Sequence, residues 1–334
     1  MNHHALTMQH LARVTVRNLC LLAVAASSFS LHAANQVLTW GDLSQDFQLT
    51  SAYRKGVREI ATGSFHCAAI QPDRRVRVWG DNRFGQTNIP ARLKRTPVLD
   101  IAAGNVHTVA LLWNGTVASW GPTAGTFGDY GQTTVPSGLK HVSAVAAGAL
   151  HSLALKRDGT VVAWGANWMG QCDVPENLSD VVAIAGGAYH SLALRRDGTV
   201  VAWGNNAQGQ CDISADLDNV VEIAAAGNHC IALRADGTVA SWGAFGLATV
   251  DVPEDLVDVV SIAAGDYHVV ALKADGTLVC WGFNEAGQCD IPEFAGKVKA
   301  LAASGKHSMI LLDTPPATTR RPAKVVARAL QHVR

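Results

Sequence analysis

The stretch VVAIAGGAYHSLALRRDGTVVAWG, residues 181–204, contains the pattern that decides the fold. Its apolar run from Val181 leads to a glycine pair, and His190 opens a second apolar run. Asp197-Gly198 predicts a tight hairpin, because both central residues of a type I′ turn need positive φ and this pair tolerates it. The β-branched segment that follows ends at Trp203 and predicts another strand. The unit therefore indicates three short antiparallel strands.

The same unit recurs along the chain of 334 residues. A Trp-Gly pair recurs at Trp40, Trp79, Trp120, Trp164, Trp203, Trp242 and Trp281, with intervals from 39 to 44 residues. A histidine recurs at His66, His107, His151, His190, His229, His268 and His307, with matching intervals. Two independent markers that keep one spacing indicate seven structural repeats.

Repeats of this length, made of antiparallel strands, are typical of propeller blades. The chain opens with only a third strand, Val37 to Trp40, and closes with the first two strands, Leu301 to Leu312. These two ends predict one shared blade, which closes the ring and removes exposed sheet edges. We therefore expect an all-β, seven-bladed β-propeller over residues 35–312, followed by a tail, 313–334, that is flexible or forms a short basic helix.

The pattern IAAGxxHSLALxxDGTVxAWGxNxxGQ resembles the regulator of chromosome condensation repeat, a family of seven-bladed propellers. The 39-residue spacing and the GQ-x-x-x-P ending, as at Gly85 to Pro90 and Gly287 to Pro292, resemble its compact bacterial subset. That subset includes secreted propeller-type β-lactamase inhibitory proteins. The resemblance covers about residues 36–312 and implies the fold, whereas one scaffold hosts many functions.

The seven histidines and seven Trp-Gly tryptophans are predicted to be scaffold. Each position is filled in every blade, whereas catalysis needs unlike groups that converge on one point. We expect each imidazole to bond a backbone group at its turn and to pack beside a neighbouring blade. Neither a metal site, nor a cofactor, nor catalytic residues are expected.

The cysteines after residue 34 also occupy repeat positions. Cys67 and Cys230 follow a histidine, and Cys172, Cys211 and Cys289 share the position held by Thr133. Equivalent positions in different blades are too far apart for a disulfide, whose Cα atoms lie within about 7 Å. Only Cys280 and Cys289, within one blade, could pair, and the sequence leaves that pairing open.

Function is expected where the repeats differ. The turn before each histidine and the turn after each Trp-Gly pair fall at the same end of the strands and hence on one face. Aromatic and apolar residues of these turns form the predicted partner-binding face: Phe65, Phe84, Phe127, Tyr130, Leu150, Trp168, Tyr189, Tyr267 and Phe283. Phe127 and Tyr130 lie in the largest insertion, and exposed aromatics are typical of protein-binding surfaces.

The N-terminus predicts export. Arg13 and Arg17 precede an apolar run from Leu19 to Leu31, and small residues follow at Ala33, so residues 1–34 resemble a signal peptide. The run is shorter than the roughly 20 residues that span a bilayer. We expect a secreted or periplasmic monomer without a membrane span. Residues 35–314 carry a net charge of −7, which argues against nucleic acid as a partner.

The favoured hypothesis is a non-enzymatic propeller that binds another protein, for instance an extracellular or periplasmic enzyme that it inhibits. The sequence does not identify the partner. One alternative is a carbohydrate or cell-wall binding module, or a glycan-active enzyme with Asp129 and Asp266 or Glu285 as its carboxylates. The other is guanine-nucleotide exchange, which resemblance to the eukaryotic namesake implies.

Overall fold

The computed structural model describes residues 36–42, 56–245, 248–249, 251–313 and 325–329. The predicted signal peptide lies outside these residues. Ala33–Arg334 form one compact unit. Within the described ranges, no helix combines the length and apolarity needed to cross a membrane.

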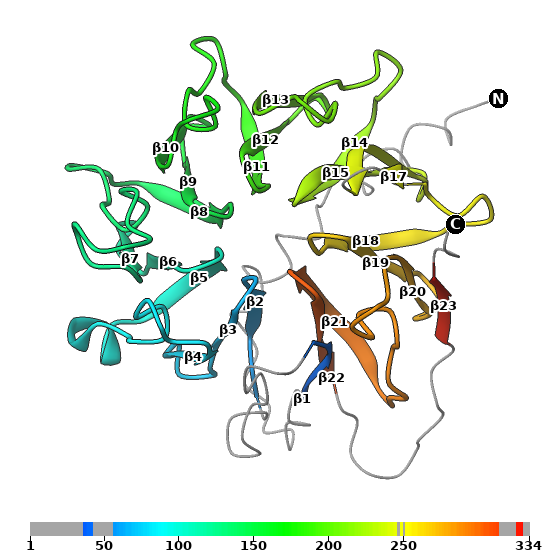
Figure 1. Cartoon of the computed structure of the whole chain (residues 1–334), viewed down its shortest axis with the longest axis horizontal. Coiled ribbons are helices and arrows are strands. Elements are labelled where there is room, and N and C mark those ends of the chain that lie inside the picture. The colour runs from blue at the N-terminus through cyan, green and yellow to red at the C-terminus, as the bar shows by residue number, and fades with distance from the viewer. Residues whose placement is uncertain (1–35, 43–55, 246–247, 250, 314–324, 330–334) are drawn as a thin grey trace, which may run out of the picture. The chain divides into compact units, whose positions relative to one another are not determined.

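The described strands form seven sheets, which are the seven blades of the predicted propeller (Figure 1). Blades 1 to 4 each have three strands: β2 (Glu59–Thr62), β3 (His66–Ile70) and β4 (Val76–Gly80); β5 (Val98–Ala103), β6 (Thr108–Leu112) and β7 (Val117–Trp120); β8 (Val142–Ala147), β9 (His151–Lys156) and β10 (Val161–Gly165); β11 (Val181–Gly186), β12 (His190–Arg195) and β13 (Val200–Gly204). A short 3-10 helix, η3 (Ala91–Lys94), follows blade 1.

Blades 5 and 6 each carry a fourth strand, and blade 7 combines the two ends of the propeller. Their strands are β14 (Val220–Ala226), β15 (Asn228–Arg234), β16 (Val239–Phe245) and β17 (Ala248–Thr249); β18 (Val259–Ala264), β19 (His268–Lys273), β20 (Leu278–Gly282) and β23 (Val325–Ala329); β21 (Lys297–Ser304), β22 (His307–Asp313) and β1 (Gln36–Gly41). β1 pairs antiparallel with β22, with Gly41 opposite His307. The predicted closure of the ring is confirmed.

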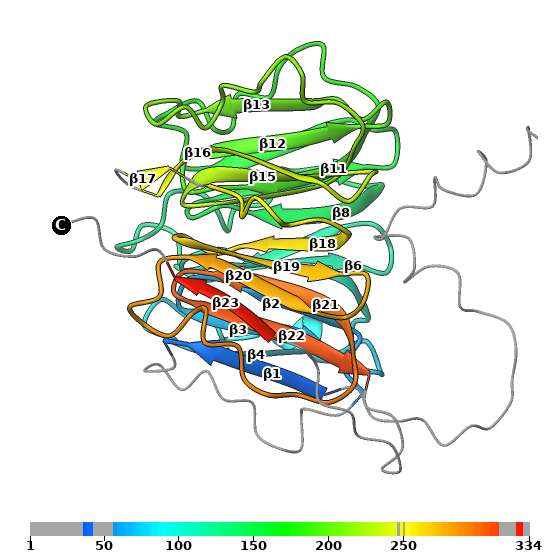
Figure 2. The same ribbon diagram turned by 90° about the vertical axis from the view of Figure 1, so that its right-hand side faces the viewer.

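The antiparallel register sorts the turns onto two faces (Figure 2). In blade 4, Gly204 lies opposite His190, so the turn before the histidine and the turn after Trp203 share one end of the strands. We call these two turns, Gly187–His190 and Gly204–Asp212 in blade 4, the His turn and the Gln turn. The Asp-Gly hairpins lie at the other end. Figure 1 views the ring from the side of the His and Gln turns.

The core lies between successive blades. One cluster joins Leu153 and Leu155 of blade 3 to Val181, Ile184 and Trp203 of blade 4, all buried. Equivalent clusters follow around the ring. Side chains from both faces of each sheet therefore reach a core, which is why the strands read as almost continuously apolar rather than alternating.

The C-terminal tail departs from the prediction. Residues 325–329 form β23, a strand that pairs in parallel with β20, with Leu278 opposite Val325, in place of the short helix considered for this tail. The physical reason is that β20 would otherwise leave an unpaired edge, and a β-branched pair such as Val325-Val326 suits a strand.

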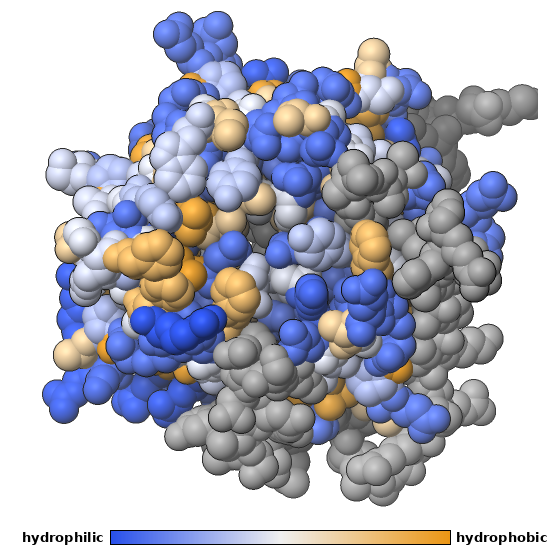
Figure 3. Space-filling view, viewed as in Figure 1, coloured by the Kyte–Doolittle hydropathy of each residue, from blue (hydrophilic) through white to orange (hydrophobic). Residues whose placement is uncertain are grey.

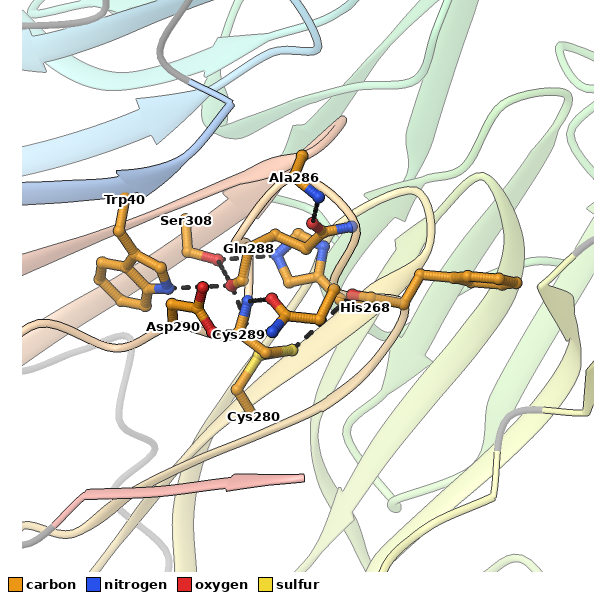
Figure 4. Close-up of a disulfide and its surroundings, with 10 residues drawn as sticks. Trp40, His268, Cys280, Ala286, Gln288, Cys289, Asp290 and Ser308 are labelled. Carbon is orange, nitrogen blue, oxygen red and sulfur yellow. Dashed lines mark hydrogen bonds between the residues drawn. A yellow bond between two sulfur atoms is a disulfide. The ribbon is translucent and has the colours of Figure 1, made fainter. Parts of the chain in front are cut away.

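The pairing that the sequence left open is present: Cys280 of β20 and Cys289 of the following Gln turn are joined by a disulfide (Figure 4). Both residues are fully buried. Cys67, Cys172, Cys211 and Cys230 are free. The bond ties the Gln turn of blade 6 to its third strand.

Replacing both bonded cysteines by the residues of other blades, Cys280→Ala with Cys289→Thr, is expected to lower the free energy of unfolding by about 2–3 kcal/mol, because the short closed loop no longer restricts the unfolded chain. Ala163 and Thr133 occupy the equivalent positions, so the variant introduces no foreign side chain. Urea unfolding measures the loss. The same loss in the wild-type protein under reducing conditions is the control, and equal stability of all three samples would contradict the expectation.

Candidate protein-binding face

A repeated hydrogen-bonded joint between blades holds this face together. The hydroxyl of Ser152 in blade 3 donates to the carbonyl of Gln132 in the Gln turn of blade 2, at 3.0 Å. The indole of Trp164 donates to the same carbonyl at 3.0 Å. The oxygen of Ser152 lies 3.0 Å from Nε2 of His107, so we assign the imidazole proton to Nε2. Figure 4 shows the same joint between blades 6 and 7, around Gln288.

The histidines therefore differ from expectation in one respect. In six of the seven blades, Nε2 of the imidazole lies within hydrogen-bonding distance of the side chain that follows the histidine of the neighbouring blade, whereas a backbone group at its own turn was expected. Thr108, Ser191 and Ser308 accept in this way. In blade 6 the equivalent residue is Val269, which has no hydroxyl or thiol.

This joint also gives the free cysteines a role. Sγ of Cys230 lies 3.1 Å from Nε2 of His190 and donates to the carbonyl of Gln210. Cys67 lies 3.4 Å from Nε2 of His307. Both thiols take the place of the serine hydroxyl, and burial raises the pKa of each. Burial likewise raises the pKa of the Cys172 thiol to about 12. Thiols held in the protonated form are poor nucleophiles.

Burial also keeps the histidines neutral. It lowers the pKa of His66, His107, His151, His229 and His268 to about 3. It lowers the pKa of His190 and His307 to about 4. A neutral, enclosed imidazole does not meet a substrate, so these seven side chains belong to the scaffold. Five Trp-Gly tryptophans are likewise buried, and Trp79 and Trp242 are partly buried.

Two groups of aromatic side chains, connected by the insertion of blade 2, lie along blades 1 to 4 on the face of the His and Gln turns. We call the two groups together the aromatic arc, and its members are Phe84, Phe127, Tyr130, Trp168 and Tyr189. Ring centroids are 6.2 Å apart for Phe84–Phe127, 4.7 Å for Tyr130–Trp168 and 6.4 Å for Trp168–Tyr189. The insertion of blade 2 carries Phe127 and Tyr130 and so links blade 1 to blade 3. Figure 3 shows apolar side chains gathered over β4–β7 on this face.

Five of the nine predicted residues are exposed, namely Phe65, Phe127, Tyr130, Trp168 and Tyr267. The exposed fraction is 85% for Phe127 and 57% for Trp168. Phe84, Leu150, Tyr189 and Phe283 are intermediate. Phe283 packs against the core between blades 5 and 6 and forms an edge-on pair with Tyr267 at 5.9 Å. The structure thus joins five predicted residues into the arc and leaves the others around it.

Two features of this face have no counterpart among the predicted residues. Met169 is 53% exposed next to Trp168. A surface pocket lies between blades 1 and 2 and is lined by Arg83, Phe84, Asn88, Trp120, Thr126 and Phe127. The only sequence signal for this pocket is the insertion itself, whose path over blade 1 depends on contacts that a sequence pattern does not show.

Two of the three carboxylates considered for glycan chemistry, Asp129 and Asp266, accept hydrogen bonds within the propeller. Asp129 accepts hydrogen bonds from the backbone N–H groups of Gly125 and Gly131, at 2.8 and 3.0 Å. The carboxylate of Asp266 accepts one from the hydroxyl of Ser64 at 3.4 Å, and burial raises its pKa. Asp129 thus holds the turn that carries it, whereas Asp266 of blade 6 bonds blade 1. Among the described residues, no group of three or more His, Cys, Asp or Glu side chains could hold a metal ion.

Solved structures of similar fold place this unit in the class of seven-bladed propellers. Prp20p from Saccharomyces cerevisiae, described with its binding properties to Gsp1p and histones, superposes with a TM-score of 0.71 at 22% identity, over 86% of this chain and 93% of that one. Human WBSCR16 gives 0.66 at 20% identity, over 84% and 99%. At these identities the likeness concerns the fold.

Four segments of the chain match a known repeat. Residues 57–86, 142–171, 181–210 and 259–288 match the regulator of chromosome condensation (RCC1) repeat. RCC1 of Candida albicans is 36% identical over 84 residues, which are 20% of this chain and 18% of that protein. The human protein HERC3, a probable E3 ubiquitin-protein ligase, is 31% identical over 77 residues, 20% of this chain and 7% of that protein. The four matched segments are RCC1 repeats, and the curated matches span less than a fifth of these relatives.

Proposed function

We propose that this chain is an exported, non-enzymatic binding propeller whose aromatic arc contacts another protein. The observation that carries the proposal is the continuous contact from Tyr130 through Trp168 to Tyr189, with Trp168 more than half exposed. Large aromatic side chains at the centre of an interface supply most of the binding free energy in many complexes. Inhibition of an extracellular or periplasmic enzyme is one form that such binding would take.

Two further features support the proposal. The polar groups that recur in the repeats, such as the Gln132 carbonyl, form hydrogen bonds between blades. The surface that differs from blade to blade therefore consists of the variable turns. The Cys280–Cys289 disulfide suits an oxidising compartment, and the buried, protonated thiols of Cys67 and Cys230 suit it as well.

The test is affinity capture with the mature protein from the surroundings of the cells that export it, followed by titration of the captured partner. Trp168→Ala is expected to weaken binding by about 2 kcal/mol or more, roughly thirtyfold, because it removes the central ring of the arc. Trp113→Ala is the matched control, since Trp113 is 62% exposed near the Asp-Gly hairpins at the other end of the strands. Equal effects of the two substitutions would contradict a role for this face.

A further inference from the structure

The face that carries the aromatic arc also carries a one-sided distribution of charge. Its Gln turns contain eight described carboxylates: Asp42, Asp81, Asp129, Asp173, Asp212, Asp251, Glu285 and Asp290. Asp266 lies in the His turn of blade 6, beside the ring axis, where it lines the axial pocket with the glycines of several His turns. The described cations of these turns are Arg83 and Lys306.

Arg83 does not balance this charge. Its Nε lies 2.8 Å from the carboxylate of Asp81, a residue of its own turn, so the pair is already neutralised. At the other end of the strands, cations accompany the aspartates of the hairpins in several blades: Arg74, Arg157, Arg196 and Lys273. The propeller therefore presents one acidic, aromatic face and a second face of mixed charge.

Asp173 and Asp212 lie close to the arc in sequence and structure. Asp173 ends the Gln turn that holds Trp168, and Asp212 ends the next one, in the blade of Tyr189. Each carboxylate is exposed and accepts a hydrogen bond from a side-chain amide, that of Asn167 and Asn206 respectively, at 2.7 Å. The asparagine amide is a neutral donor, so this hydrogen bond does not pair either carboxylate with a cation.

We infer that the partner of this face is a protein segment rich in arginine or lysine, whose cations lie over the rings of the arc and beside Asp173 and Asp212. This inference rests on the proposed function and adds the chemistry of the partner. A cation over the face of a tryptophan or tyrosine is attracted by the ring, and surrounding carboxylates strengthen that attraction and steer the encounter. The edge-on contact of Tyr130 with Trp168 leaves ring faces available for it. Nucleic acids and anionic lipids are repelled by the same carboxylates.

The test uses two synthetic peptides of equal length, in which leucine alternates with arginine in one and with glutamate in the other, titrated into the mature protein by calorimetry. The arginine peptide is expected to bind at least tenfold more tightly than the glutamate peptide. Its affinity is expected to fall as salt is raised, because screening shortens the range of charge attraction to about 10 Å near 0.1 M. Equal affinities, a preference for glutamate, or no binding of either peptide at about 1 mM overturns the inference.

Substitutions locate the effect. Asp173→Asn with Asp212→Asn is expected to weaken the arginine peptide about fivefold, since charges at the rim of an interface contribute modestly. The turns tolerate asparagine here, because blade 1 has Asn88 at this position, bonded to Asn82 at 2.9 Å. Glu176→Gln with Glu254→Gln is the charge-matched control, at two exposed positions in the loops before β11 and β18. An equal loss in the control pair overturns the inference.

The outcomes separate this inference from the proposed function. Suppose that Trp168→Ala, but not Trp113→Ala, weakens binding of the captured partner, while the arginine and glutamate peptides bind with equal affinity. The proposed binding face is then supported, and the inference of a cationic partner is rejected. Suppose instead that the arginine peptide binds and that Asp173→Asn with Asp212→Asn weakens its binding, whereas Trp168→Ala does not. The acidic surface is then supported as a binding site, and the aromatic arc is rejected as one.

Discussion

The stability of the propeller is expected to fall steeply as the pH drops below about 6.5. Seven buried histidines have pKa values of about 3 or 4 in the folded protein, against 6.5 as their ordinary value. Between these limits the unfolded chain binds more protons than the folded one, so lowering the pH favours unfolding. Each histidine contributes about 1.4 kcal/mol per pH unit, and seven together about 10 kcal/mol per pH unit. That is comparable with the whole stability of a typical domain, about 5–15 kcal/mol.

Other titrating groups do not cancel this effect. Hydrogen bonds from Thr199 and Thr238 lower the pKa of Asp197 and Asp236, so these carboxylates lose their stabilising contribution only at still lower pH. Burial raises the pKa of Asp266, which favours the folded state as pH falls, but this is one group against seven.

Urea unfolding at pH 7.5, 6.5 and 5.5 measures this dependence, and we expect unfolding near pH 5.5 without denaturant. Calorimetry in buffers of different ionisation enthalpy supplies a second readout, the uptake of several protons on unfolding. Stability that is flat or rises between pH 7.5 and 5.5 would show that the imidazoles are charged or accessible in the folded protein.

The repeat made most of this fold predictable. A histidine and a tryptophan recur at the positions of His190 and Trp203 in every blade, and their shared spacing identifies seven units. The incomplete units at the two ends of the sequence predict that β1 closes the ring. The same recurrence separates scaffold from surface, since a position filled identically seven times serves a contact that every blade makes.

What the repeat did not predict depends on contacts outside it. The contact between Phe127 and Phe84 depends on the backbone path of a five-residue insertion, and this insertion has no counterpart in other blades. The imidazoles of His151 and His190 have their partners in the next blade, 40 positions away in the sequence, and a pattern within one repeat does not reveal such a contact. The pairing of β23 with β20 depends on an open sheet edge, which no local pattern in the tail reveals.

Gly187→Ala is expected to destabilise the protein by about 3 kcal/mol or more, at the upper end of what overpacking costs in a close-packed interior. A methyl group on Gly187 would overlap the imidazole of His190. That ring cannot move away, because it is fully buried and its Nε2 lies 3.1 Å from the thiol of Cys230 in blade 5. Gly276→Ala is the control: its backbone has a φ of +88° and nothing lies within 4 Å of the added methyl group. It is expected to lose only about 1–2 kcal/mol, the usual penalty for a left-handed residue.

Blade 5 shows how the overlap is avoided when alanine is present. Ala226 stands three residues before His229, and the glycine has moved one position on, to Gly227, whose φ is +50°. The double variant Gly187→Ala with Ala188→Gly gives blade 4 the same Ala-Gly-x-His order and should recover part of the lost stability in urea unfolding. If the double variant is less stable than Gly187→Ala alone, steric overlap with the imidazole is not the cause. Recovery of stability in the double variant would mean that the position of this glycine determines which of two backbone paths the His turn takes. The same position would then also determine how the ring of Tyr189 lies beside Trp168.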